Sequence, residues 1–160
     1  MTRAPVLPAL LLAIAMSVAS GCGEESCTDL SGSAAKDLSL SFDDVVIQHF
    51  SVGPSLVIKY SSAGAGFPAI LSVNSAGVAF GSGTTLEFAG DQAAAGEPAH
   101  AFGNATRSME DGQQFGEVQG GTLTLDSFGG GSAEGDLGFR FKDGESLRGQ
   151  FCGSVTEVDG

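Results

Sequence analysis

Short runs in which apolar and polar residues alternate constrain the fold of this chain more than any other feature. In one of them, Leu56, Ile58 and Tyr60 alternate with Val57 and Lys59. Successive side chains of a strand point to opposite faces, so such alternation predicts strands with one buried face. Glycine-rich breaks such as GAGFP, NSAG and GSG separate the runs, as turns require. The predicted strands lie within residues 38–42, 45–50, 56–60, 71–73, 78–80, 86–88, 122–125, 137–142 and 147–151.

The number and spacing of these runs indicate the fold class. About eight to ten short strands with frequent turns predict an all-β domain, an antiparallel β-sandwich or a small closed barrel. No stretch has a helical period of adequate length, and 160 residues favour one domain. We expect a single β domain over 37–160. Residues 22–36 are polar and small, which predicts a tether that is flexible apart from Cys27.

The turn at Asp143-Gly144 allows the register of one hairpin to be predicted. A two-residue loop would set Arg140 opposite Leu147 and mix the core and solvent faces. A three-residue loop over 142–144 instead pairs Phe139 with Leu147 and Leu137 with Gly149, so that every apolar residue falls on one face. It also puts Gly144 at the left-handed position of a bulged hairpin.

The N-terminus has the parts of an export signal. Arg3 supplies a positive charge, and the apolar stretch from Val6 to Val18 is too short to span a bilayer as a permanent helix. Ala19-Ser20-Gly21-Cys22 then resembles the lipobox of bacterial lipoproteins, in which the cysteine is acylated and becomes the mature N-terminus. The resemblance covers residues 1–22 only and implies a signal peptide over 1–21. The alternative is ordinary signal cleavage after Ala19.

The same resemblance bears on localisation and on the cysteines. Gly23 follows the acylated residue where Asp would favour the inner membrane, which implies an exported protein anchored in the outer membrane, facing the periplasm or the surface. Acylation of Cys22 leaves Cys27 and Cys152 to pair in an oxidising compartment. That bridge would add about 5 kcal/mol of stability by the chain-entropy estimate. Cys27 lies within roughly 17 Å of Cys22, so we expect the end of the last strand to face the membrane.

Composition excludes several functions. Acidic residues outnumber basic ones 19 to 7, which argues against nucleic acid as a partner. The chain has two histidines, His49 and His100, and no G-x-S-x-G motif, so a catalytic triad is not indicated. The chain has too few His and Cys residues to supply the ligands of a zinc site. Calcium has weak candidates in Asp126, Glu134 and Asp136, which flank a glycine-rich loop, although their spacing matches no calcium motif.

The sequence therefore predicts a lipid-anchored, non-catalytic binding, adhesion or assembly module that needs no cofactor. The expected partners are the membrane, through the acyl anchor, and an envelope protein or glycan. One alternative is a carrier whose barrel would hold an apolar ligand among several phenylalanines. Another is a hydrolase that uses carboxylates such as Glu110, Asp111 and Glu117. The carrier would be lined by Phe42, Phe80, Phe88, Phe139 and Phe141.

Overall fold

The alternating runs form nine strands in a computed structural model that describes residues 27–90 and 100–159. Because Cys22 and the expected signal peptide precede residue 27, they lie outside the described residues. The elements are β1 (Asp29–Ser31), α1 (Ser33–Asp37), β2 (Asp44–Phe50), β3 (Ser55–Ser62), β4 (Gly66–Asn74), β5 (Thr85–Ala89), β6 (Phe102–Met109), β7 (Val118–Gly129), β8 (Ser132–Phe141) and β9 (Ser146–Val158).

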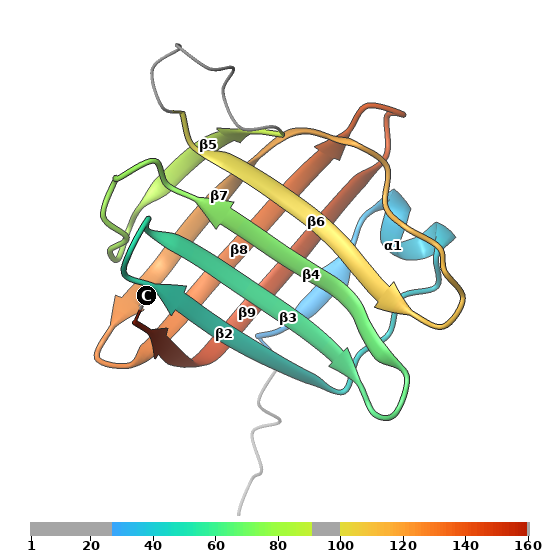
Figure 1. Cartoon of the computed structure of the whole chain (residues 1–160), viewed down its shortest axis with the longest axis horizontal. Helices are drawn as coiled ribbons and strands as arrows, with labels where there is room; N and C mark the ends of the chain where they lie inside the picture. The colour runs from blue at the N-terminus through green and yellow to red at the C-terminus, as the bar shows by residue number, and fades with distance from the viewer. Residues whose placement is uncertain (1–26, 91–99, 160) are drawn as a thin grey trace, which may run out of the picture.

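The strands form one sheet that closes on itself. Its order is β1-β9-β2-β3-β4-β6-β5-β7-β8. The last strand in this order, β8, also pairs with β9, and this pairing closes the ring. Figure 1 shows β2, β3, β4 and β6 crossing in front of β7, β8 and β9. We call β2, β3, β4 and β6 the front layer and β5, β7, β8 and β9 the back layer. The predicted all-β class is confirmed, and the ring is flattened into two layers.

Two junctions make this ring irregular. β2 runs parallel to β9, from Ile47 opposite Val155 to Phe50 opposite Val158. β5 and β6 are also parallel and share one residue pair, Ala89 with Phe102. All other strand neighbours are antiparallel. The sheet is therefore mixed, and the closed ring is not a regular barrel.

The β8–β9 hairpin has the predicted register. Phe139 lies opposite Leu147, and Leu137 lies opposite Gly149. Gly144 has a φ of 92°, which a residue with a side chain rarely adopts. The N–H of Gly144 donates to the carbonyl of Phe141 at 3.1 Å and closes the turn. The face that the alternation assigned to the core is the buried one.

The space between the two layers is filled by large side chains. Tyr60 from the front layer is fully buried, and its hydroxyl donates to the carbonyl of Gln150 in the back layer at 2.7 Å. A Cβ at Gly149 would lie 2.6 Å from that hydroxyl, so glycine is required where Tyr60 crosses. The other large side chains less than 2% exposed are Phe141, Phe151, Ile47, Leu56, Ile58, Leu71, Leu123, Leu125, Leu137 and Leu147, with Phe139 at 2%.

The expectation of a flexible tether up to residue 36 is wrong for its second half. β1 pairs with β9, from Asp29 opposite Gln150 to Ser31 opposite Arg148. The short helix α1 follows, with Ala34 and Ala35 buried against the core. A strand of three residues and a helix of five are too short to give a recognisable period, because each covers only about one repeat.

Two predicted strands are loops, and β6, like β1, was not predicted. Residues 38–42 follow α1 as irregular chain, and Phe42 packs edge-on against Tyr60 with ring centres 5.0 Å apart. Val78 and Phe80 lie in the loop before β5. β6 was missed because its inward positions hold Gly103, Ala105 and Arg107, which show no apolar alternation. Within 27–90 and 100–159, no helix has the length and hydropathy needed to cross a membrane.

Candidate functional site

The predicted cysteine pair is present in the structure. Cys27 and Cys152 form a disulfide with their Cα atoms 5.8 Å apart, a normal separation. Cys152 follows the inward-facing Phe151, so it lies on the outer side of the back layer. The last strand does not end beside this bridge, as the predicted range 147–151 had it, because β9 continues to Val158 and pairs there with β2. The disulfide therefore holds the N-terminal segment against a wall of the fold rather than one end.

The weak calcium candidates lie on the outer side of the same layer. Asp136 forms an ion pair with Arg148, from Oδ1 to Nη2 at 2.5 Å. Asp126 and Glu134 are exposed residues of β7 and β8. In the part of the chain that the structure describes, no group of three His, Cys, Asp or Glu is placed to hold a metal ion.

Two of the three carboxylates considered for a hydrolase, Asp111 and Glu117, have basic partners, and Glu110 is exposed. Asp111 is bound to the buried guanidinium of Arg107, with Oδ2 3.1 Å from Nη2. Glu117 forms an ion pair with Lys142. Arg107 also donates from Nη1 to the carbonyl of Gln113, while its Nε has no hydrogen-bond partner among the described residues. These contacts fasten the 111–117 segment to β6 and to the turn after β8, and they give Asp111 and Glu117 a structural role.

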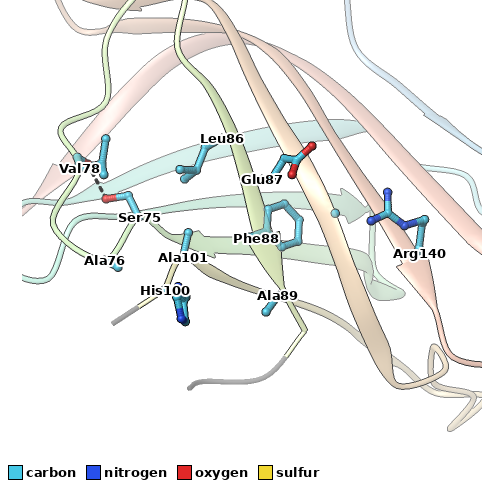
Figure 2. A pocket seen from close by; sticks show the side chains of 11 residues that line it. Ser75, Ala76, Val78, Leu86, Glu87, Phe88, Ala89, His100, Ala101 and Arg140 are labelled. Atoms are coloured by element: carbon cyan, nitrogen blue, oxygen red, sulfur yellow. Dashed lines mark hydrogen bonds between the residues drawn. The ribbon is translucent and has the colours of Figure 1, made fainter. Parts of the chain in front are cut away.

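The two histidines occupy different settings. His49 is the next-to-last residue of β2, and its Nδ1 lies 2.7 Å from Glu157 Oε2. Its ring packs edge-on against Phe80 and Phe128, with ring centres 5.7 and 5.2 Å away. His100 is exposed and borders a hollow of about 460 Å³ beside β5 (Figure 2). Figure 2 shows Glu87 and Arg140 at separate places around this hollow.

The phenylalanines of the carrier hypothesis pack against other rings. Phe139 lies between Phe88 and Phe141, with ring centres 5.2 and 6.5 Å away. Phe80 contacts Phe128 at 5.9 Å in the group around His49. Together with the fully buried aliphatic side chains, these contacts favour core packing over a ligand cavity lined by the same rings.

A groove of about 330 Å³ lies on the outer side of the front layer. Strand register explains its shape. In one cross-strand row, Ser55 and Asn74 form the floor between Phe50 on β2 and Phe102 on β6. We call this the front groove. It is lined by Phe50, Val52, Ser55, Val57, Ser72, Val73, Asn74 and Phe102.

The next row repeats the same profile. Val57 and Ser72 form the floor, and the longer polar side chains of Gln48 and Asn104 lie on the flanking strands. Small residues on β3 and β4 therefore lie between larger ones on β2 and β6 for two successive rows. In the third row Lys59 and Ile70 occupy the floor positions, so larger side chains end the groove there.

Hydrogen bonds fix one end of the groove. The Asn74 amide nitrogen donates to Ser55 Oγ at 2.9 Å and to the carbonyl of Gly53 at 3.1 Å. Its oxygen accepts from the N–H of Ala76 at 2.9 Å. These bonds hold the β2–β3 turn, where Val52 is 72% exposed. A rigid floor with an exposed apolar residue at its mouth is an arrangement suited to binding.

Among the residues that the structure describes, none that lines the front groove is charged. Sequence analysis did not identify this groove, because it depends on β6 lying beside β4. The available signal was the small serines at alternate positions, Ser55 on β3 and Ser72 on β4. No protein-family model, curated protein or solved structure matches this chain.

Proposed function

We propose that this chain is an exported, lipid-anchored domain of the cell envelope that binds a partner in the front groove and performs no catalysis. The observation that carries the proposal is the placement of the uncharged groove on one layer and the disulfide on the other. The lipobox-like segment would attach acyl chains at Cys22, about 17 Å or less from Cys27. The membrane would then adjoin the back layer, and the front groove would be presented away from it.

Charge and packing support binding rather than catalysis. Depletion of charged residues with enrichment of aromatic ones is typical of the buried centre of protein interfaces. Two of the acidic residues considered for hydrolysis, Asp111 and Glu117, lie in ion pairs with Arg107 and Lys142. His49 packs among phenylalanine rings. None of these groups borders the front groove.

The anchoring part of the proposal is tested by the intact mass of protein extracted from membranes. We expect a mature chain that begins at Cys22 and carries acyl groups. Reduction should add only the hydrogens taken up by one disulfide. A mature chain that begins at Ser20 and carries no lipid would overturn the anchor.

The binding part is tested by photo-crosslinking in cells. A photoreactive side chain at Asn104 places the probe beside the groove, and one at Thr124 on β7 serves as the matched position on the back layer. We expect a discrete adduct from Asn104 and none of the same size from Thr124. Equal adducts from both positions, or adducts from Thr124 alone, would rule out the front groove as the contact surface.

A further inference from the structure

The front groove has a specific chemical character. Its walls in the first row are the rings of Phe50 and Phe102, which are half-buried and can present apolar faces to a ligand. Two adjacent strands separate β2 from β6, so the walls stand about 14 Å apart at the usual strand spacing. An apolar ring face on a ligand can pack against either phenyl group.

The second row supplies uncommitted hydrogen-bonding groups. Gln48 and Asn104 make no side-chain hydrogen bond within the described residues. Each amide offers donors and an acceptor, which is the combination that pairs with hydroxyl groups acting in both roles. By contrast, Asn74 and Ser55 in the floor are already bonded to each other and to the β2–β3 turn.

Electrostatics restrict the ligand further. The groove lining carries no charge, and the whole chain has a formal net charge of −12. The long-range field therefore opposes an anionic ligand. A cationic ligand would find no carboxylate in the lining with which to pair. The ligand that fits is uncharged.

Backbone pairing argues against an added peptide strand. Every strand of the groove floor is paired on both sides, β3 with β2 and β4, and β4 with β3 and β6. A peptide in the groove would therefore find no ladder of backbone groups, and its own amides would be desolvated without partners. The hydroxyl groups of a sugar can remain in contact with water in an open groove.

We infer that the front groove binds an uncharged oligosaccharide segment, with Phe50 and Phe102 packing on sugar faces and Gln48 and Asn104 bonding to hydroxyls. This inference rests on the proposed binding function and names its ligand class. The groove volume of about 330 Å³ lies within the usual range for small-ligand sites, so a short stretch of sugar rings is recognised rather than a long chain.

The test is binding of the full-length protein, purified in detergent, to defined oligosaccharides. The probes are oligosaccharides of glucose, galactose, mannose and N-acetylglucosamine, with a uronic-acid oligosaccharide as the charged comparison. At least one uncharged probe should bind, and the charged probe should not. Asn104→Ala should weaken binding about fivefold through one lost hydrogen bond. Phe102→Ala should weaken it roughly tenfold or more.

Thr106→Ala is the matched control, because Thr106 lies on the same strand and face one row beyond the groove. It should leave binding unchanged. Asn104 is exposed, so its variant tests the groove even where Phe102→Ala lowers stability. Failure of every uncharged probe to bind the folded protein would overturn the inference, as would equal binding by Asn104→Ala and wild type. If crosslinks from Asn104 persist in either case, the binding function stands and only the ligand class fails.

Discussion

The two layers of this fold present different outer surfaces. The outer side of the back layer carries Glu134, Asp136, Arg140 and Arg148, and two of these four form an ion pair. The front layer carries Asp44 and Lys59 in the rows beyond the groove, and the two groove rows hold only serine, asparagine, glutamine, valine and phenylalanine.

This difference assigns hydration to the outer surface of the back layer and binding to that of the front layer. Charged side chains keep the back layer hydrated, and exposed ion pairs contribute little to stability. The front layer exposes apolar area at Val46, which is 38% exposed, and at Val52. Sheets do not need such residues on a solvated face. The comparison therefore predicts that back-layer changes affect folding, whereas front-surface changes affect binding.

The largest expected effect on folding comes from the disulfide of the back layer. Cys152→Ser should lower the free energy of unfolding by about 2–5 kcal/mol, because the bridge closes 125 residues of chain. Denaturant unfolding measures the loss. Cys22→Ser should leave that free energy unchanged, since Cys22 is assigned to the lipid and not to the bridge. Equal stability of Cys152→Ser and wild type would contradict a structural role for the disulfide.

A second back-layer change compares the inner and outer sides of the sheet. Gly149→Ala would place a methyl group 2.6 Å from both the Tyr60 hydroxyl and Leu71 Cδ1, so we expect a loss of about 1–3 kcal/mol. Gly138→Ala is the control, because its nearest neighbour is the Thr122 carbonyl oxygen at 3.9 Å. Thermal unfolding of the two variants checks this. Similar melting temperatures would mean that Tyr60 is not tightly held between the layers.

Tyr60 links the layers and should make stability sensitive to alkali. Burial, together with the charge of Asp29, raises the pKa of Tyr60 well above its usual value of about 10. Above that value the unfolded chain loses the phenolic proton while the folded chain keeps it. Stability should therefore fall as pH rises past about 10. Tyr60→Phe should flatten this dependence and cost about 1 kcal/mol at neutral pH through the lost bond to Gln150.

Absorbance in the near ultraviolet checks the titration directly, because the chain has one tyrosine and no tryptophan. We expect the phenolate signal to appear together with unfolding. A phenolate that forms in the folded protein near pH 10 would show that Tyr60 is open to solvent.

The sequence predicts the pairing of two strands where a turn that can be recognised from its residues joins them. The β8–β9 hairpin was predictable to the residue, because Leu137 and Phe139 must share a face with Leu147 and Gly144 fixes the loop. Cys152 could likewise be placed on the outer face from its position after Phe151. Local alternation contains enough information for such pairs.

The closure of the ring and the groove could not be predicted in this way. β2 and β9 are far apart in the sequence and pair in parallel without a connecting turn. β6 lacks visible alternation because Phe88 occupies the space beside Gly103, where a Cβ would lie 2.3 Å from its ring. Gly103 is needed because a side chain from another strand packs there, so tertiary packing and not the local pattern sets this residue. Phe102 of β6 forms one wall of the groove, so the groove could not be predicted once β6 was missed.

A charge placed on the outer face of each layer should have the smallest effect on stability, and it gives the most direct test of the comparison. Ser72→Glu puts a carboxylate on the groove floor, and Ser154→Glu puts one on β9 opposite Ser132. Both positions are on outer faces, so each change should alter the free energy of unfolding by about 0.5 kcal/mol or less. Their effects on binding should differ, because only the first carboxylate must lose water when a ligand enters the groove.

The yield of the adduct formed from the photoreactive side chain at Asn104 measures that difference. Ser72→Glu should reduce the yield roughly tenfold or more, since desolvating an unpaired carboxylate costs well over about 1 kcal/mol. Ser154→Glu should leave the yield unchanged. If both variants retain the adduct, the uncharged surface of the front layer is not what the partner contacts, and the two layers differ in composition without differing in role.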